Sequence, residues 1–425
     1  DMIQTIPAKD GLEYDWVMYP GSSAPYRVQI SDSSKVRFFM KEEPGMYDLD
    51  LFVKDKTTNV GFYKKFYVKV TSVFNQGWLV MDEKNGHNDI SIIQPNNTVE
   101  RAIYSKSNNG EYLPAGWGKV CVYNRRTEQM IYFLSTNDGI QVNKANFVRS
   151  SRMKDWFFLD PGAIKPLDVF AQSTEEHFLT RDKAYGANLT VTPPYKYGFS
   201  TMGNYYLAPY QLSINIGSFI FYDTIAQRFW FRPVGNGDYA LANISLPANT
   251  PQPWNLNNIG KRLLYAGMGP SSNFSAVFES NQRDSLFLLR GLLNGGSSVS
   301  QIVDTLPAGQ LMQTASQYLA SRSVQHIYFA SDNKLYRWDL LAKTQTLVYT
   351  FPAGTEVRKM KWYYNNKSST DPDNYNLMMV AAQEGAEGKV YMFPIALTGD
   401  ITGGTYRNVF GGFGQIRDVT YKPAP

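Results

Sequence analysis

Hydrophobic and polar residues alternate in short segments along the first 72 residues. In the segment Tyr47–Lys54, hydrophobic side chains occupy the odd-numbered positions, and aspartate or lysine occupies most of the even-numbered ones. A period of two is typical of a β-strand with one buried face. Similar patterns predict further strands around Trp16 and over residues 26–30, 36–40 and 66–70. We therefore expect a small β-sandwich over residues 1–72 that lacks one edge strand, with further residues before Asp1.

After Gly77 the pattern changes to a repeating unit of four short strands. The clearest copy occupies residues 316–351, where short hydrophobic segments are separated by polar turns. Ser331–Lys334 is a tight turn, because its Asp-Asn pair tolerates the positive φ angles that such turns require. Four antiparallel strands in so short a segment are typical of one blade of a β-propeller.

Weaker copies of the same unit recur along the rest of the chain. They lie at residues 119–142, 167–182, 219–231, 262–304 and 357–393. Residues 73–425 divided among seven blades give about 50 residues per blade, which is within the range of such repeats. We therefore predict a propeller of seven blades over residues 73–425.

An internal similarity predicts how the ring of blades closes. Val357–Trp362 resembles Ile416–Tyr421 position by position, but the first segment opens a blade and the second lies close to the end of the sequence. The strands Gly77–Met81 and Asp89–Ile93 lack such an opening strand. We therefore predict that residues 416–421 form the inner strand of the first blade, which closes the ring and removes its open edges.

Composition narrows the class of protein without identifying a ligand. Hydrophobic residues make up 43% of the chain and charged residues 19%, which is a globular composition. Aromatic residues reach 15%, with 29 tyrosines, and favour strands. The net charge of +5 is small and the basic residues form no long run, so nucleic-acid binding is not predicted. No hydrophobic run reaches the length of about 18 residues that spans a bilayer.

Three parts of the sequence resemble the PKD-like lipoproteins of Bacteroides-type bacteria. They are Pro44–Asp55, Gly77–Asp82, and Ala330–Asp339 with the following Tyr349–Gly354. The first is similar to the late strands of a PKD or immunoglobulin-like module. The resemblance extends over most of the chain and implies an all-β protein, with an immunoglobulin-like or PKD-like sandwich over residues 1–72 and a β-propeller over residues 73–425.

The resemblance also implies a location and partners. Such proteins are exported to the outer membrane and face outward, held by a lipidated cysteine that would precede Asp1. Their genes often lie beside SusC/SusD-type nutrient importers, which implies an accessory or substrate-capturing role for an oligopeptide or a glycan. The family has no established catalytic residues, so the resemblance transfers none.

The single cysteine and the three histidines are not strong candidates for catalytic residues. Cys121 is the single cysteine and lies in a hydrophobic strand, so we expect it to be buried and unreactive. Among the three histidines, we expect His326 to be paired within a blade and His87 to lie in a hairpin turn. His177 follows two glutamates, but adjacent strand residues face opposite ways, so we expect a solvated strand edge and no metal site. The sequence predicts no cofactor.

Carboxylates leave one enzymatic alternative open. The acidic loop Ser369–Asn374 lacks the glycine and the final glutamate of an EF-hand, so we expect a polar surface turn. No zinc-protease, nucleophile-elbow, phosphate-loop or CxxC motif occurs. Propeller glycosidases and lyases assemble their acids near the axis from separate blades, which local motifs cannot reveal. A glycoside hydrolase or lyase with an axial site is therefore the alternative to a non-enzymatic protein.

A long aromatic segment is the best candidate for binding. Residues 193–210 are long for a blade connection, and long loops in compact domains are usually functional or disordered. Tyrosine-rich surfaces suit sugars, peptides and protein interfaces. The candidate residues for binding a ligand or partner are Tyr195, Tyr197, Phe199, Tyr205, Tyr206 and Tyr210. The alternative is that these rings pack beneath the loop against the third and fourth blades.

Three functions are compatible with the predicted fold, which does not choose among them. An aromatic patch favours a binding or accessory subunit, and a deep acidic funnel with paired carboxylates favours a hydrolase or lyase. A large apolar interface without a pocket favours a structural scaffold. We predict the first, a non-enzymatic accessory or substrate-capturing subunit of a SusC/SusD-type uptake complex.

Overall fold

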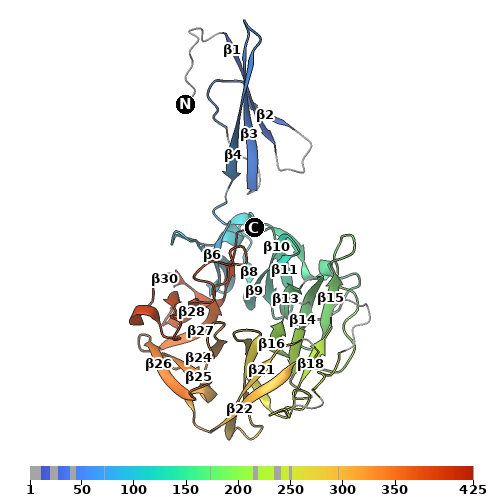
Figure 1. The fold of residues 1–425 in the computed structure, drawn as a ribbon, viewed down its shortest axis with the longest axis vertical. Helices are drawn as coiled ribbons and strands as arrows, with labels where there is room; N and C mark the ends of the chain where they lie inside the picture. Colours follow the sequence, from blue (N-terminus) through green and yellow to red (C-terminus); the bar gives the residue numbers. More distant parts are fainter. Residues whose placement is uncertain are drawn as a thin grey trace. The chain divides into compact units, whose positions relative to one another are not determined.

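The chain forms two compact units, which the computed structural model divides between Asn75 and Gln76. The units are Asp1–Asn75 and Gln76–Pro425 (Figure 1). The sequence placed the boundary between residues 72 and 73. The structure describes residues 11–19, 27–38, 45–70, 72–172, 174–213, 219–233, 241–247, 251–294 and 296–424.

The described residues of the first unit form one antiparallel sheet in the order β2-β1-β3-β4. Its strands are β1 (Leu12–Tyr19), β2 (Val28–Ser31), β3 (Gly45–Asp55) and β4 (Gly61–Val70). The predicted alternation in β3 is confirmed, because Leu49, Leu51 and Val53 are buried with Trp16 on one face. In the predicted strand 36–40, residues 36–38 lie outside any strand, and the other two fall outside the described residues.

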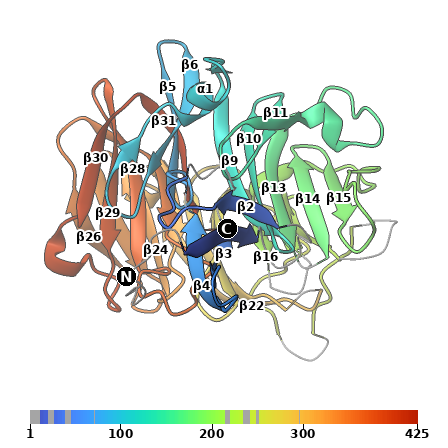
Figure 2. The ribbon, with the colours of Figure 1, turned by 90° about the horizontal axis from the view of Figure 1, so that it is seen from above.

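The described residues of the second unit form seven antiparallel sheets, which Figure 2 shows as blades arranged in a ring. The first three blades contain β31 (Gln415–Lys422), β5 (Gly77–Lys84), β6 (His87–Ile93), β7 (Val99–Glu100) and β8 (Leu113–Pro114); β9 (Trp117–Arg125), β10 (Glu128–Ser135), β11 (Gly139–Val142) and β12 (Arg149–Arg152); and β13 (Pro166–Gln172), β14 (Glu175–Thr180) and β15 (Ala184–Asn188). The all-β fold with a seven-bladed propeller is therefore confirmed.

The remaining blades follow in chain order. They contain β16 (Leu207–Ser213), β17 (Phe219–Asp223) and β18 (Arg228–Arg232); β19 (Arg262–Met268), β20 (Asn273–Glu279), β21 (Ser285–Leu292) and β22 (Val299–Pro307); β23 (Gln317–Ala320), β24 (His326–Ser331), β25 (Lys334–Asp339) and β26 (Thr344–Thr350); and β27 (Thr355–Trp362), β28 (Leu377–Glu384), β29 (Glu387–Pro394) and β30 (Asn408–Phe413). The described helical segments are α1 (Ile103–Ser107), η1 (Met153–Trp156), η2 (Leu311–Thr314) and η3 (Thr402–Gly404). In the predicted turn between β24 and β25, Asp332 has a φ of 51°.

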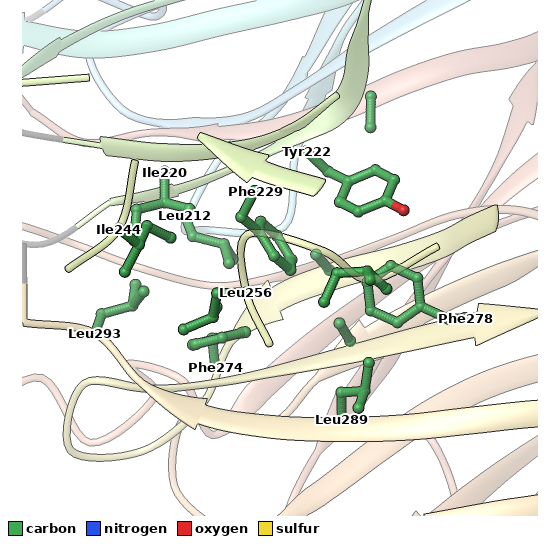
Figure 3. Packing of buried hydrophobic residues seen from close by; sticks show 14 residues of the cluster. Leu212, Ile220, Tyr222, Phe229, Ile244, Leu256, Phe274, Phe278, Leu289 and Leu293 are labelled. Atoms are coloured by element: carbon green, nitrogen blue, oxygen red, sulfur yellow. The ribbon is translucent and has the colours of Figure 1, made fainter. Parts of the chain in front are cut away.

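Neighbouring blades pack face to face through large hydrophobic side chains. Between the fourth and fifth blades, the Tyr222 ring lies 5.2 Å from the Phe278 ring, and Phe229 contacts Phe274 at 5.9 Å between ring centres. Figure 3 shows this layer, in which side chains from the two blades interdigitate. Because both faces of a central strand are covered in this way, such a strand carries hydrophobic residues on both sides.

The ring closes as the sequence predicted. Strand β31 pairs antiparallel with β5, in a register that runs from Gln415 opposite Glu83 to Lys422 opposite Gly77. The internal similarity extends to the backbone: the pairing shifts between Val357 and Lys359 in β27, and between Ile416 and Asp418 in β31.

Similar shifts occur in the first strands of several blades, which lie beside one another around the ring. A β-bulge re-aims the side chains that follow it and is frequent next to functional sites. The residues that directly follow such an irregularity are Lys119, Asp168, Gln211, Tyr265, Lys359 and Asp418. Charged and polar residues of separate blades thereby meet near the axis.

Deleting residues 415–425 should destabilise the whole propeller. The deletion removes Ile416 and Val419, whose buried side chains contribute about 1.5–3 kcal/mol each, and leaves β5 with an open edge. Thermal unfolding followed by circular dichroism should show a lowered or lost cooperative transition. Deleting only residues 424 and 425 is the control and should retain the transition, and an unchanged melting temperature in the longer deletion would contradict the closure.

Candidate functional site

The six aromatic residues predicted to form a binding surface occupy four different environments. Tyr195 and Phe199 line a surface pocket of about 620 Å³. Tyr197 and Tyr205 are buried, so they are not part of an exposed binding surface, and packing beneath the loop describes them correctly. The remaining two lie apart from the pocket. Tyr206 is exposed, and its N–H donates to Asp223. Tyr210 lines a second pocket between the first strands of the second to seventh blades, which we call the axial channel.

Tyr197 anchors the loop to the body of the propeller. Its hydroxyl donates to Glu176 Oε1 at 2.6 Å, and its ring lies 5.3 Å from that of Phe157. The Tyr197 N–H donates to the carbonyl of Trp156 at 2.8 Å, and the N–H of Phe158 donates to the carbonyl of Tyr197 at 3.0 Å. The buried tyrosine therefore fixes the backbone of Phe158, whose side chain is 64% exposed.

Tyr205 fixes the other end of the same loop. Its hydroxyl donates to the carbonyl of Thr201 at 2.9 Å and accepts the N–H of Ala184 at 3.0 Å. Between the two anchors, Phe199 is 83% exposed and Met202 is also exposed. Two buried tyrosines thus hold a segment whose hydrophobic side chains face solvent.

The pocket is lined mainly by hydrophobic side chains. These are Phe158, Val191, Pro194, Tyr195, Phe199 and Met202. The Arg125 guanidinium lies 5.6 Å from the centre of the Tyr195 ring and is ion-paired with Glu176, so a fixed cation lies beside the aromatic wall. Grouped exposed hydrophobic side chains around a pocket of this size are typical of a site that binds a ligand or another protein.

The sequence did not identify three of the lining residues. Phe158 and Val191 lie outside the segment 193–210, and Met202 lies inside it but is not one of its aromatic residues. In the hydrophobic run Phe157–Leu159, Phe157 is buried, whereas Phe158 and Leu159 are exposed. Residues 157 and 158 contact Tyr197, which is about 40 residues further along the chain, and no local sequence pattern predicts this contact.

The prediction of a solvated strand edge at His177 is wrong. Glu175, Glu176 and His177 are all buried, because β14 is the central strand of its blade and neighbouring blades cover both its faces. Their side chains still alternate: Glu175 binds Arg232 at 2.8 Å, while Glu176 pairs with Arg125 of β9. His177 Nδ1 lies 3.1 Å from Arg232 Nη1, so it accepts a hydrogen bond from this cation.

Other residues with catalytic or metal-binding chemistry are engaged within the fold. Cys121 is buried, and its burial and the nearby Asp168 raise the pKa of its thiol. His326 is buried and lies 3.2 Å from Asp339, as predicted for a paired blade histidine. In the acidic loop, Asp371 accepts the Tyr363 hydroxyl, and Asp373 is ion-paired with Arg407. Within the described ranges, no group of three or more His, Cys, Asp or Glu residues is arranged to hold a metal ion.

The axial channel is lined by basic and aromatic residues. Asp168 binds Lys119 at 2.7 Å and accepts a hydrogen bond from Gln211 at 2.6 Å. Asp418 lies behind the lining, beside Lys359 and Lys361. Burial alone would raise the pKa of Asp418, but these lysines and the Val120 N–H lower it below its ordinary value. A general acid in a glycosidase requires a raised pKa, so Asp418 does not fit that role.

Residues 2–116 match the family model described as the PKD-like family. The matched range covers the first unit and continues through β8 into the first blade. No curated protein matches the sequence. The described residues contain no helix that is long and apolar enough to cross a membrane.

Similar solved structures show a likeness of fold alone. A protein from Lactobacillus plantarum has a TM-score of 0.50 at 10% identity, over 82% of this chain and 99% of that one. A quinonprotein alcohol dehydrogenase-like protein from Bacteroides thetaiotaomicron has a TM-score of 0.47 at 12% identity, over 96% of this chain and 92% of that one. The observed sheets and the family match define an all-β protein with a β-propeller and an N-terminal segment similar to the PKD-like family.

The buried His177 should make stability depend on pH. Burial, and then the Arg232 cation, lower its pKa well below 6.5, so the folded protein keeps this imidazole neutral. The unfolded chain binds this proton more readily than the folded protein does. The stabilisation that the neutral His177 gives the folded state is therefore complete above about pH 6.5 and is lost as the pH falls further. The free energy of unfolding, measured by denaturant titration between pH 7.5 and 5, should fall more steeply for the wild type than for His177→Gln. Parallel pH curves for the two proteins would contradict the assignment.

Proposed function

We propose that the protein is a non-enzymatic binding protein that captures a peptide or glycan at the pocket of the third blade. The observation that carries this proposal is a group of aromatic side chains around a pocket of about 620 Å³: the exposed Phe158 and Phe199, with the half-buried Tyr195. Exposed aromatic rings lose little conformational entropy on binding, and they pack against the apolar faces of sugars and peptide side chains.

The construction of the pocket supports a binding role. Its exposed residues are held by buried tyrosines at both ends of the loop, so part of the ordering cost is met before a ligand arrives. The Arg125–Glu176 ion pair beneath Tyr195 holds that wall from below. Phe199 and Met202, which project from the loop, provide the hydrophobic contact area.

The proposal includes a location and a partner. The protein would lie at the outer membrane, held through an N-terminal lipid anchor and facing outward, and would pass its ligand to a SusC/SusD-type importer. The support is the resemblance of the strand segments, together with the match of residues 2–116 to the PKD-like family.

Replacing Phe158 and Phe199 with alanine should weaken ligand binding. Truncating two exposed aromatic anchors should raise the Kd by about 10-fold or more. Binding should be measured by screening the wild type against peptide and glycan arrays and then titrating the strongest hit with both proteins. Because the two side chains are largely exposed, the melting temperature should change little.

The matched control is Leu397→Ala, which removes a hydrophobic side chain that is 81% exposed in the seventh blade. It should bind like the wild type. Equal affinity in the folded Phe158→Ala/Phe199→Ala variant would reject the pocket as the capture site.

Affinity purification from native membranes in mild detergent tests the proposed partner. Mass spectrometry should identify a SusC/SusD-type pair with the wild-type protein. Recovery of the protein alone would contradict the accessory role and leave a free-standing binding protein.

A further inference from the structure

The axial channel forms a second cavity that shares no lining residue with the pocket of the third blade. Its volume is about 860 Å³, and the first strands of six blades contribute to its wall. Cavities of this size accommodate small organic ligands. The bulges in these strands direct charged residues toward it.

Cations outnumber anions on the wall of this channel. The charged residues that line it are Lys119, Asp168, Arg262, Lys359 and Lys361. Lys119 is paired with Asp168, and Arg262 is paired with the buried Glu279. Both remaining lysines therefore depend on a single further carboxylate, that of Asp418.

Asp418 does not saturate the two ammonium groups. Its Oδ1 lies 3.8 Å from Lys359 Nζ and 3.7 Å from Lys361 Nζ, which is ion-pair distance but longer than a hydrogen bond. Its Oδ2 accepts the Val120 N–H at 3.0 Å. Each ammonium group therefore keeps protons that it can donate into the channel.

The electrostatics of Lys359 agree with an excess of positive charge. The Asp418 carboxylate favours its charged form, but desolvation and repulsion from Lys361 and Lys119 outweigh this, and the pKa of Lys359 is lowered. An anion placed between the ammonium groups would relieve this repulsion.

Another part of the wall is aromatic. The Tyr265 and Tyr318 rings are stacked at 5.7 Å between their centres, and Tyr210 meets Tyr265 at 5.3 Å. The hydroxyls of Tyr210 and Tyr318 donate to backbone carbonyls of Leu264 and Met312, which holds the rings in place. The channel thus combines an anion-attracting side with a rigid, largely apolar side.

We propose that the axial channel binds a small organic ligand with an oxyanion group, a carboxylate or a phosphate. The oxyanion accepts hydrogen bonds from Lys359 and Lys361, and the body of the ligand lies against the tyrosine wall. Neither residue of this pair takes part in the aromatic pocket, so the site functions independently of the proposed capture site.

Calorimetric titration of the full chain at low ionic strength tests the proposal. The probes are glucuronate, its neutral counterpart glucose, and inorganic phosphate. We expect glucuronate to bind at least about 10-fold more tightly than glucose, and Lys361→Gln to weaken this binding about 10- to 100-fold. Lys154→Gln, which neutralises an exposed lysine of η1, is the matched control and should bind like the wild type.

The phosphate titration and the further variants show which part of the wall provides the affinity. Phosphate binding as tight as that of glucuronate would support an oxyanion site without a contribution from the tyrosines, and preference for glucuronate would support both parts of the wall. Lys361→Gln leaves Lys359 beside Asp418, which favours folding of this variant; if it does not fold, loss of wild-type binding with added salt provides the same evidence. Absence of binding by both anions, or unchanged binding in folded Lys361→Gln, would overturn the proposal. Phe158→Ala/Phe199→Ala should retain glucuronate binding, which distinguishes the two sites.

Discussion

Asp418 lies where the ring of blades closes, and the geometry of the propeller depends on the contacts made there. It belongs to β31, which pairs with β5 in the first blade. Its carboxylate accepts the Val120 N–H of the second blade and faces Lys359 and Lys361 of the seventh. One fully buried carboxylate thus joins three blades, because it can satisfy a backbone donor and attract two ammonium groups at once. The same contacts set the charge of the axial channel.

The third blade uses buried polar groups in a comparable way to support an exposed surface. Glu176 accepts the Tyr197 hydroxyl and pairs with Arg125, whose guanidinium lies beside the Tyr195 ring. On the other face of β14, Glu175 pairs with Arg232. Buried ion pairs of this kind add little net stability but require specific partners, so they fix the position of the loop above them. The loop that carries the exposed rings of the pocket is therefore held in one position.

Local patterns in the sequence were sufficient to predict most of the strands and the closure, because period-two alternation and the similarity of residues 357–362 to 416–421 lie within short segments. The predicted strand 36–40 is an exception, since its residues 36–38 form no strand. Local patterns were also insufficient at His177, where alternation correctly separated Glu175 from Glu176 but could not show that neighbouring blades cover both faces of β14. The aromatic loop shows the same limit. Tyr197 and Phe199 look alike in the sequence, yet the Tyr197 ring packs against Phe157 and Phe178 and is buried, whereas the Phe199 ring is exposed.

The distance along the chain between the two closing strands has a consequence for biosynthesis. Gln76 and Tyr421, which meet beside the β5–β31 pair, are 345 residues apart. A ribosome therefore produces β5 long before its partner, and nearly the whole propeller must emerge before that edge is covered. Such a distant pairing slows folding and leaves an unprotected strand on every incomplete chain. Until β31 is made, the edge of β5 therefore stays open to pairing with other chains.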